Sequence, residues 1–292
     1  MGSDVAFEDF KKRVRLAVEE ALRAFFAACP ATEVGKVAEY AVLGGGHRWR
    51  AMTTVAAGRM FHENAFDLCM PGACGLELAH AASLVLDDLP SMDDARFRRG
   101  RRCAHLVFAR WAVDLAPAFM INMAYDVTLA NSLVPAERRV RASLEVARAA
   151  RCMFEGQEVD IAERAKGGTE ENLLACYRLK TGALYAAAAK AGAIVCGAAD
   201  EDAATVSECG IHLGLASQFH DDIADVVAGV HNAGKEAGRD GAKLTAVDLF
   251  GIEGTRKRAS EFEEAALSKL RSFGPAADIL RTLVCHANWT TE

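Results

Sequence analysis

Two clusters of aspartates lie inside otherwise apolar segments of the chain, LVLDDLPSMDD and QFHDDIADVV. The carboxylates are Asp87, Asp88, Asp93 and Asp94 in the first cluster, and Asp221, Asp222 and Asp225 in the second. Pro90 takes the chain off a regular helix, so Asp93 and Asp94 can fold back toward the preceding pair. Asp221 and Asp225 are four residues apart and therefore share a helix face.

Carboxylates crowded into apolar surroundings are costly unless cations neutralise them. Mg²⁺ binds one or two carboxylates and completes its shell with water and phosphate oxygens. A solvated acidic face would explain a single aspartate pair, but it does not explain two clusters that are each embedded in apolar helix. The sequence therefore predicts two halves of a magnesium site.

Basic residues accompany both clusters. They are Arg98 and Arg99 after the first cluster, Lys180 in the KTG interruption of an apolar helix, Lys235 and Lys243 in the loop after the second cluster, and Arg48 and Arg50 beside Gly45 and Gly46 in GGGHRWR. Arginine and lysine converging on carboxylate-bound magnesium is the chemistry of a polyphosphate ligand. A nucleotide is disfavoured because the chain has no GxxxxGK[ST] loop and no strand to carry one.

The elements that must position these residues are helices. Apolar residues recur every three or four positions over the segments 7–25, 66–89, 104–133, 136–166, 169–196, 201–226 and 255–273. Pro30 ends the first helix and Thr32 opens the next. No segment alternates with a period of two. We predict an all-α chain in which residues 1–292 form a single domain of ten or more helices.

The composition narrows the partners and the compartment. The net charge of −6 disfavours a nucleic-acid partner, and nine cysteines without a CxxC pair indicate reduced thiols. The longest apolar stretch, residues 182–199, is interrupted by Lys190, so we expect a buried helix and not an integral membrane protein. The chain enters an amphipathic helix without a signal peptide, which predicts a cytoplasmic protein, or a plastid one if a leader was removed.

Seven ordered motifs resemble those of the trans-isoprenyl diphosphate synthases, the farnesyl and geranylgeranyl diphosphate synthase family. They are GGHRWR at 45–50, DDLPSMD at 87–93, RRG at 98–100 with His105 beyond it, GQEVD at 156–160, KTG at 180–182, Gln218, and HDDIAD at 220–225. The resemblance covers roughly residues 7 to 255. It implies an all-α helical bundle around a deep central cavity, usually as a homodimer, with a heterodimer of related chains as the alternative.

The resemblance also implies a role for each matching residue. Three Mg²⁺ ions per active site would be bound directly by Asp87, Asp93 and Asp221, with Asp88, Asp222 and Asp225 in support. The catalytic residues would be Asp87, Asp88, Asp93, Lys180, Asp221 and Asp222. The allylic diphosphate would contact Arg98, Lys180, Thr181, Gln218, Lys235 and Lys243. Isopentenyl diphosphate would contact Gly46, His47, Arg50, His80 and Arg99.

The implied reaction is a condensation of these two prenyl diphosphates. Metal ions and basic residues would stabilise the charge that develops on the leaving diphosphate, so that the allylic C–O bond ionises. The double bond of isopentenyl diphosphate would then attack the carbocation, and a proton would be lost. An apolar cavity would exclude water during these steps.

Two small residues precede the first motif by about one helical turn. Ala82 and Ser83 stand where short-chain members of the family carry aromatic residues. Space at this depth predicts a C20 product, geranylgeranyl diphosphate, with C15 farnesyl diphosphate as the alternative. Equally, the small residues could serve only the packing of the helix.

The chain departs from the family in the half of the site that binds isopentenyl diphosphate. His47 replaces a lysine, and a neutral imidazole offers one donor where an ammonium offers three. Pro117 and Ala118 replace a glycine and an aspartate. We therefore consider three interpretations: a working synthase with weakened isopentenyl diphosphate binding, a terpene-synthase-like enzyme that ionises an allylic diphosphate without condensation, and a weakly active regulatory subunit of a heteromeric synthase.

Overall fold

The structure is a computed structural model that describes residues 2–164, 169–231 and 244–287, and in these residues it is almost entirely helical. The helices are α1 (Gly2–Ala28), α2 (Glu33–Val42), α3 (Trp49–Gly58), α4 (Ala65–Asp87), α5 (Arg110–Leu129), α6 (Ala136–Arg164), α7 (Glu170–Tyr177), α8 (Ala183–Val195), α9 (Asp200–His231), α10 (Ala246–Lys269) and α11 (Asp278–Cys285). Shorter elements are strands β1 (Phe97–Arg98) and β2 (Arg101–Arg102), 3₁₀ turns η1 (Ala104–Leu106) and η3 (Pro275–Ala277), and the π-helical segment η2 (Arg178–Gly182). The predicted all-α class is confirmed.

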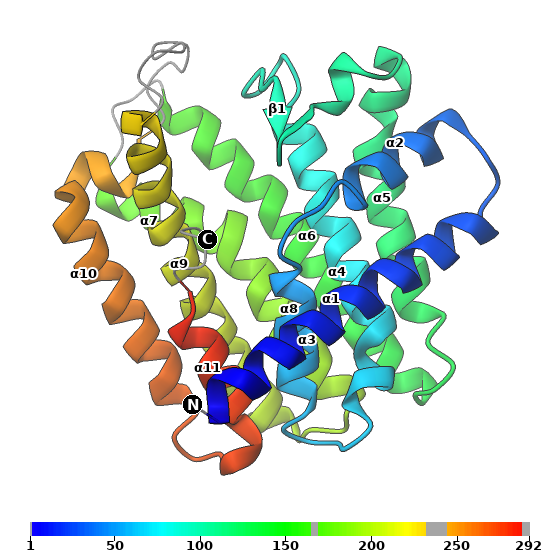
Figure 1. Ribbon diagram of the computed structural model, residues 1–292, viewed down its shortest axis with the longest axis vertical. Helices are drawn as coiled ribbons and strands as arrows, with labels where there is room; N and C mark the ends of the chain where they lie inside the picture. Colours follow the sequence, from blue (N-terminus) through cyan, green and yellow to red (C-terminus); the bar gives the residue numbers. More distant parts are fainter. Residues whose placement is uncertain (1, 165–168, 232–243, 288–292) are drawn as a thin grey trace.

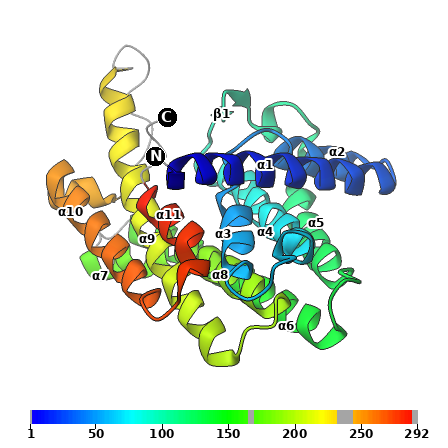
Figure 2. The same ribbon diagram turned by 60° about the horizontal axis from the view of Figure 1, so that its bottom comes forward.

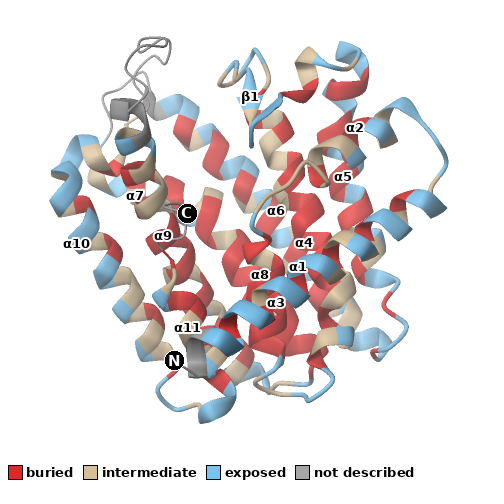
Figure 3. Cartoon of the chain, in the orientation of Figure 1, coloured by how far each residue is buried: buried red, intermediate tan, exposed pale blue. Residues whose placement is uncertain are grey.

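Helix α8 lies at the centre of the bundle (Figure 1), where it packs against α3, α4, α6 and α9. Every residue of α8 except Ala183 and Lys190 is buried, and Figure 3 shows the same concentration of buried residues around it. Its small side chains let neighbouring backbones approach closely: a Cβ added to Gly192 would lie 2.0 Å from the carbonyl oxygen of Thr54 in α3. The apolar stretch from 182 onward is therefore a core helix, as predicted.

The amphipathic first helix covers the outside of this centre. Helix α1 crosses α3 and α4 (Figure 1, Figure 2) and buries a stripe that includes Phe7, Val14 and Leu22. It ends at Ala28, and the hydroxyl of Thr32 accepts a hydrogen bond from the backbone N–H of Gly35 at 3.0 Å to cap α2. The predicted boundary between these two helices is confirmed.

Two local features were not predicted from the sequence, one between the predicted helical segments 66–89 and 104–133 and one inside the segment 169–196. The residues after the first aspartate motif form a short antiparallel hairpin, β1–β2, which turns through Arg99 and Gly100 at positive φ. The predicted helix over 169–196 is interrupted by η2, a single π-helical turn that contains the KTG motif. The hairpin and the π-helical turn are each only a few residues long, and segments this short leave little periodicity in the sequence.

Helix α4 is long and apolar enough to cross a membrane by length and composition alone. Two-thirds (67%) of its most apolar window is buried inside the protein, which is what a core helix of a bundle requires. It packs against α3, α5 and α8. The C-terminal ends of α4 and α9, which carry the two aspartate motifs, both point toward the end of the bundle where the β1–β2 hairpin lies (Figure 1).

Candidate active site

The first aspartate motif folds back on the end of α4. Asp87 is the last residue of that helix, and its carbonyl oxygen accepts a hydrogen bond from the backbone N–H of Asp93 at 2.9 Å. The N–H of Met92 donates to the carbonyl of Leu89 at 2.9 Å, which tightens the intervening turn. The backbone therefore brings Asp93 next to Asp87, as the position of Pro90 predicted.

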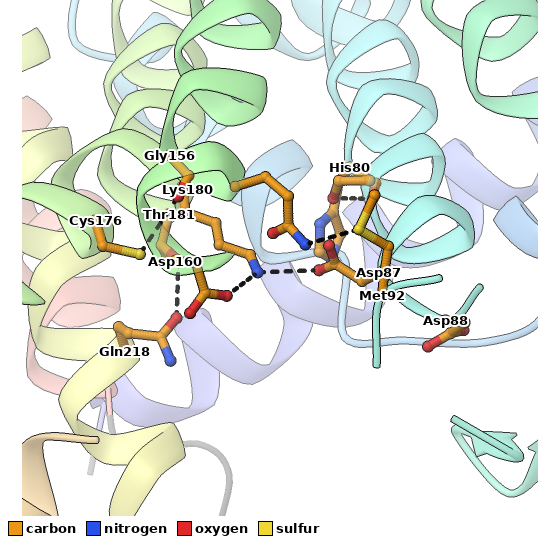
Figure 4. A network of polar contacts seen from close by, with 12 residues as sticks. His80, Asp87, Asp88, Met92, Gly156, Asp160, Cys176, Lys180, Thr181 and Gln218 are labelled. Carbon is orange, nitrogen blue, oxygen red and sulfur yellow. Dashed lines mark hydrogen bonds and ion pairs between the residues drawn. The ribbon is translucent and has the colours of Figure 1, made fainter. Parts of the chain in front are cut away.

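The carboxylate of Asp87 meets a lysine that lies between two carboxylates. The ammonium of Lys180, in the π-helical segment η2, lies 3.4 Å from Asp87 and 3.0 Å from Asp160 of α6. Figure 4 shows the lysine reaching between the two carboxylates. Both carboxylate side chains are largely buried. Each of these carboxylates needs a positive charge beside it, because an unpaired charge in this environment would be costly.

The residue after this lysine connects the first motif to the second. The hydroxyl of Thr181 donates to the side-chain oxygen of Gln218 at 2.8 Å (Figure 4). Gln218 lies on α9 one turn before Asp221 and Asp222. Because Lys180 and Thr181 are neighbours, Asp87 and the second motif are joined through two consecutive residues of η2. The structure thus connects the first motif, through Lys180 and Thr181, to Gln218 on the helix that carries the second motif.

Asp221 lies where a negative charge is unfavourable. Burial, together with the nearby carboxylates of Asp225 and Asp222, raises the pKa of Asp221 to about 7, against the opposing effect of Arg50. A cation placed here would remove the repulsion between these carboxylates. Asp221 therefore has the electrostatic character of a ligand for a metal ion.

The carboxylate of Asp222 is directed at other groups of the protein, unlike that of a metal ligand in an open cleft. It accepts hydrogen bonds from the Tyr177 hydroxyl at 2.5 Å, the backbone N–H of Ala246 at 2.7 Å and the side-chain amide of Gln218 at 3.2 Å. Burial raises its pKa, while these hydrogen bonds lower it. Asp222 thus fixes the first residue of α10 against α7 and α9.

Asp88 likewise has a partner of its own. The guanidinium of Arg98 donates to it from two nitrogens, at 2.5 and 3.1 Å, and the Asp88 side chain is buried. Figure 4 shows Asp88 pointing away from Asp87 and Lys180. This ion pair attaches the β1–β2 hairpin to the end of α4. For Asp88 to bind a metal, or Arg98 a phosphate, this pair would have to separate.

A second group of basic residues lies beside His80 of α4. Burial and then the positive charges of Arg50, Arg99, Arg98 and Arg48 hold the pKa of His80 well below its usual range, so the imidazole is neutral. Arg50 lies 4.9 Å above the ring of Tyr185. These arginines converge from α3 and the hairpin, as expected of a site for an anion.

Glycine residues admit one of these arginines. Arg99 donates to the carbonyl of Gly45 at 2.5 Å, and a Cβ on Gly46 would lie 2.5 Å from the Arg99 guanidinium carbon. Gly46 itself has a φ of 113°, which favours glycine. His47 is exposed, with its ring 6.4 Å from that of Trp49. Four of the five residues predicted for isopentenyl diphosphate, His47 apart, thus lie around one basic region.

The remaining predicted residues are placed as follows. Ala82 is buried in α4, and Ser83, half-buried, donates to the carbonyl of His80 at 2.8 Å. Lys235 and Lys243 lie outside the described residues. Among the described residues, Asp88, Arg98 and the hairpin line a small hollow of about 40 Å³. The depth available to a prenyl tail stays a prediction.

Sequence reasoning gave no role to two charged residues that hold this region together, Asp160 and Glu77. Asp160 holds Lys180, and the buried Glu77 lies 3.4 Å from the buried Arg48 and accepts from the N–H of Ala51 at 3.1 Å. The signal for Glu77 was a lone carboxylate in the apolar segment CGLELAH, and that for Asp160 was the last residue of the GQEVD motif. Arg48, which the sequence placed with the phosphate-binding residues, is committed to Glu77 and to the carbonyl of Val42 at 2.7 Å.

The donor set suits a hard cation shared between the two motifs. No group of three or more His, Cys, Asp or Glu residues within the described ranges is already arranged around one point. Asp87 and Asp221 would instead each contribute oxygen atoms from one side. Carboxylate oxygens are the ligands that Mg²⁺ prefers, and burial together with the neighbouring carboxylates raises the pKa of Asp221, so that a cation there would stabilise its charged form.

Comparison with known proteins decides the family. Residues 31–274 match the polyprenyl synthetase family. The chain belongs to this family. It is 34% identical over 290 residues to a mitochondrial geranylgeranyl pyrophosphate synthase of Arabidopsis thaliana, which covers 93% of this chain and 86% of the relative. It is 32% identical over 271 residues to a dimethylallyltranstransferase of Fischerella ambigua, and the match covers 91% of this chain and 78% of that relative.

The solved structures agree with this assignment. An FPP/GFPP synthase from Zymomonas mobilis superposes with a TM-score of 0.82 at 25% identity, over 97% of this chain and 99% of that one. The isoprenoid-synthase fold is therefore confirmed, and this polyprenyl synthetase is an enzyme of the trans-isoprenyl diphosphate synthase family. The finer identity of its substrates and product belongs to the proposal that follows.

Proposed function

We propose that this polyprenyl synthetase condenses an allylic diphosphate with isopentenyl diphosphate in a Mg²⁺-dependent reaction, and that its product is geranylgeranyl diphosphate, with farnesyl diphosphate as the shorter alternative. The observation that carries the proposal is the chain of contacts from Asp87 through Lys180 and Thr181 to Gln218. This chain of contacts links the two aspartate motifs, and the arginines whose charges act on His80 form a basic region on α3 and the hairpin.

Each part of the site has a task in this reaction. Asp87, Asp93 and Asp221 would hold Mg²⁺, with Asp88, Asp222 and Asp225 in support. Lys180, Thr181, Gln218 and Arg98 would orient the allylic diphosphate, together with Lys235 and Lys243. Gly46, His47, Arg50, His80 and Arg99 would receive isopentenyl diphosphate.

The chemistry is the loss of diphosphate followed by carbon–carbon bond formation. When bound by these aspartates, Mg²⁺ would supply positive charge that stabilises the leaving diphosphate. Lys180 would add an ammonium at the same place, and Thr181 and Gln218 would present oriented dipoles toward the cation that forms. Neutral His80 can accept or donate a hydrogen bond without adding another positive charge beside the arginines.

The decisive experiment is a product assay with the purified chain, Mg²⁺, farnesyl diphosphate and labelled isopentenyl diphosphate. A labelled C20 diphosphate supports the proposal. A hydrocarbon or alcohol formed without isopentenyl diphosphate would support the terpene-synthase-like alternative instead. No product from the isolated chain, with activity restored by a co-purified related synthase, would support the regulatory-subunit alternative. Geranyl diphosphate as the starting substrate tests whether synthesis stops at C15.

The assembly and the compartment are part of the same proposal. We infer a dimer, either of two copies or with a related chain. The relatives named above include a mitochondrial one, and another relative of Arabidopsis thaliana is described as chloroplastic. For this chain a cytoplasmic or plastid compartment stays a prediction.

A further inference from the structure

The ammonium of Lys180 already provides the positive charge that faces Asp87. The Nζ atom lies 3.4 Å from the Asp87 carboxylate, at the end of α4 where the proposed metal site begins. Both side chains are shielded, with 17% of Lys180 and 13% of Asp87 exposed. A Coulomb interaction at this distance is strong because solvent screens it weakly. Any second cation that uses Asp87 must therefore compete with this lysine.

Asp160 gives the lysine a second, firmer contact. Its carboxylate lies 3.0 Å from Nζ and its side chain is only 7% exposed. Asp160 lies on α6 and Lys180 on η2, and these elements are closely packed: a Cβ on Gly156 would lie 2.7 Å from the backbone nitrogen of Lys180. The lysine can therefore give up Asp87 without leaving the site, since Asp160 retains it (Figure 4).

We propose that Lys180 is an exchangeable counter-ion that couples metal binding to diphosphate binding, and that Asp160 is the positioning residue that makes this exchange possible. The inference rests on the proposed function, because it assigns Asp87 to the metal site. A metal ion that arrives without diphosphate can bind Asp87 only by displacing the ammonium of Lys180. A metal ion that arrives with a diphosphate offers the ammonium new oxygen partners. Metal and diphosphate are then bound together more tightly than either is alone.

The proposal predicts opposite effects of one substitution on two equilibria. Lys180→Met removes the competitor of the metal but also removes a phosphate contact. It should tighten the binding of Mn²⁺ alone and weaken the binding of Mn²⁺ in the presence of inorganic pyrophosphate, each by about tenfold, as expected for a close charge pair. Mn²⁺ replaces Mg²⁺ here because it takes the same oxygen ligands and free Mn²⁺ is measured directly by electron paramagnetic resonance.

Asp160→Asn provides the complementary variant. Without Asp160 the ammonium is left to Asp87, so Mn²⁺ alone should bind more weakly than to the unsubstituted protein. In the double variant Lys180→Met, Asp160→Asn the lysine is gone, and the second substitution should have no further effect on Mn²⁺ binding. The double variant also shows whether Asp160 itself becomes a metal ligand in Lys180→Met, because it removes that carboxylate. Lys180→Arg should keep both the charge and the coupling.

The outcomes separate this inference from the proposed function. If Lys180→Met binds Mn²⁺ alone no more tightly than the unsubstituted protein, the counter-ion role is wrong, whatever the product assay gives. If the double variant differs from Lys180→Met, Asp160 does not act through Lys180. General damage to the fold would weaken both equilibria together, and the melting temperature measured in EDTA would fall with them. The readouts use no prenyl substrate, so failure to form a prenyl product would contradict only the proposed function.

Discussion

At the scale of single residues, the surroundings of a carboxylate decide what it can do. Asp222 is bound by Tyr177 and by the start of α10, whereas Asp221, the preceding residue, has a pKa raised to about 7 by burial and by neighbouring carboxylates. The two are adjacent in the sequence and differ only in the direction they face. Their neighbours make Asp222 a structural contact and leave Asp221 suited to a cation.

Asp221 makes the stability of the protein depend on pH. Between its ordinary value of 3.8 and its folded value of about 7, the folded protein keeps a proton that the unfolded chain has released. The free energy of unfolding contributed by this group therefore falls as the pH rises through this window. In EDTA, Asp221→Asn should melt at a higher temperature than the unsubstituted protein at pH 8, by about 3 °C or more if at least 1 kcal/mol is recovered.

The same comparison at pH 4.5 provides the control, because the gain should largely disappear where the folded protein already holds the proton. An equal gain at both pH values would show that the charge of Asp221 is not its cause. Thermal denaturation followed by circular dichroism is sufficient for both measurements.

His47 gives a second prediction at this scale. It is exposed, and it lies in the same GGHRWR motif as Arg50, one of the arginines whose charge acts on His80. His47→Lys adds an ammonium with three donors, so KM for isopentenyl diphosphate should fall several-fold. This change corresponds to a gain of about 1 kcal/mol in binding free energy from an added hydrogen bond. KM for the allylic diphosphate should not change. An unchanged KM for isopentenyl diphosphate, flat between pH 6 and 8, would contradict this role of His47.

At the scale of the elements, close contact between helices fixes where the site residues stand. Helix α8 continues the η2 segment that carries Lys180 and Thr181, and it packs directly on α3, which carries Arg50. Gly192 permits this approach, since any side chain there would meet the Thr54 carbonyl. The position of η2 relative to α3 therefore depends on a glycine far from the proposed chemistry.

Gly192→Ala should lower the free energy of unfolding by roughly 1–3 kcal/mol, because an added methyl group overfills a packed core. Gly72→Ala in α4 is a matched control: its Cβ would meet no atom within 4 Å, and alanine raises helix stability by up to about 1 kcal/mol over glycine. Urea denaturation of the two variants measures both effects. Equal stabilities of the two variants would contradict the close α3–α8 contact.

At the scale of the whole molecule, α5 and α6 carry an apolar surface that lies outside the core. Trp111, Leu115 and Phe119 recur every four residues along α5 and are exposed, while Met120 beside them is fully buried. Val140 and Leu144 are exposed on α6, the next helix, which contacts α5. The large apolar residues of this segment are thus divided between the core, which takes Met120, and an exposed surface suited to a subunit interface.

This surface predicts a dimer with a mass of twice the 31.3 kDa chain, measurable by light scattering after gel filtration. Leu115→Glu should shift the protein toward monomer, because a carboxylate would be buried without a partner. Leu16→Glu is the control, since Leu16 is similarly exposed on α1, away from α5 and α6. A monomeric unsubstituted chain that dimerises only with a co-expressed related synthase would favour the heterodimer over the homodimer.

The amino-acid sequence by itself determined the helices, their principal boundaries and the two aspartate motifs. These are local properties: apolar residues at a period near 3.6 and capping residues act over a few positions. The sequence did not predict the short hairpin or the π-helical turn at 178–182, because these segments are too short to show a periodic pattern of apolar residues. The sequence did not predict the roles of Asp160 and Glu77, because their partners lie on other helical segments.

Only the tertiary structure decided which partner each charged side chain meets. Asp87 faces Lys180, Asp88 faces Arg98, and Asp222 faces the first residue of α10. Each of these directions depends on how helices distant in the sequence pack against one another, and packing is a property of the whole core. Residue type can predict that an aspartate needs a cation, but the geometry of the bundle determines which cation it has.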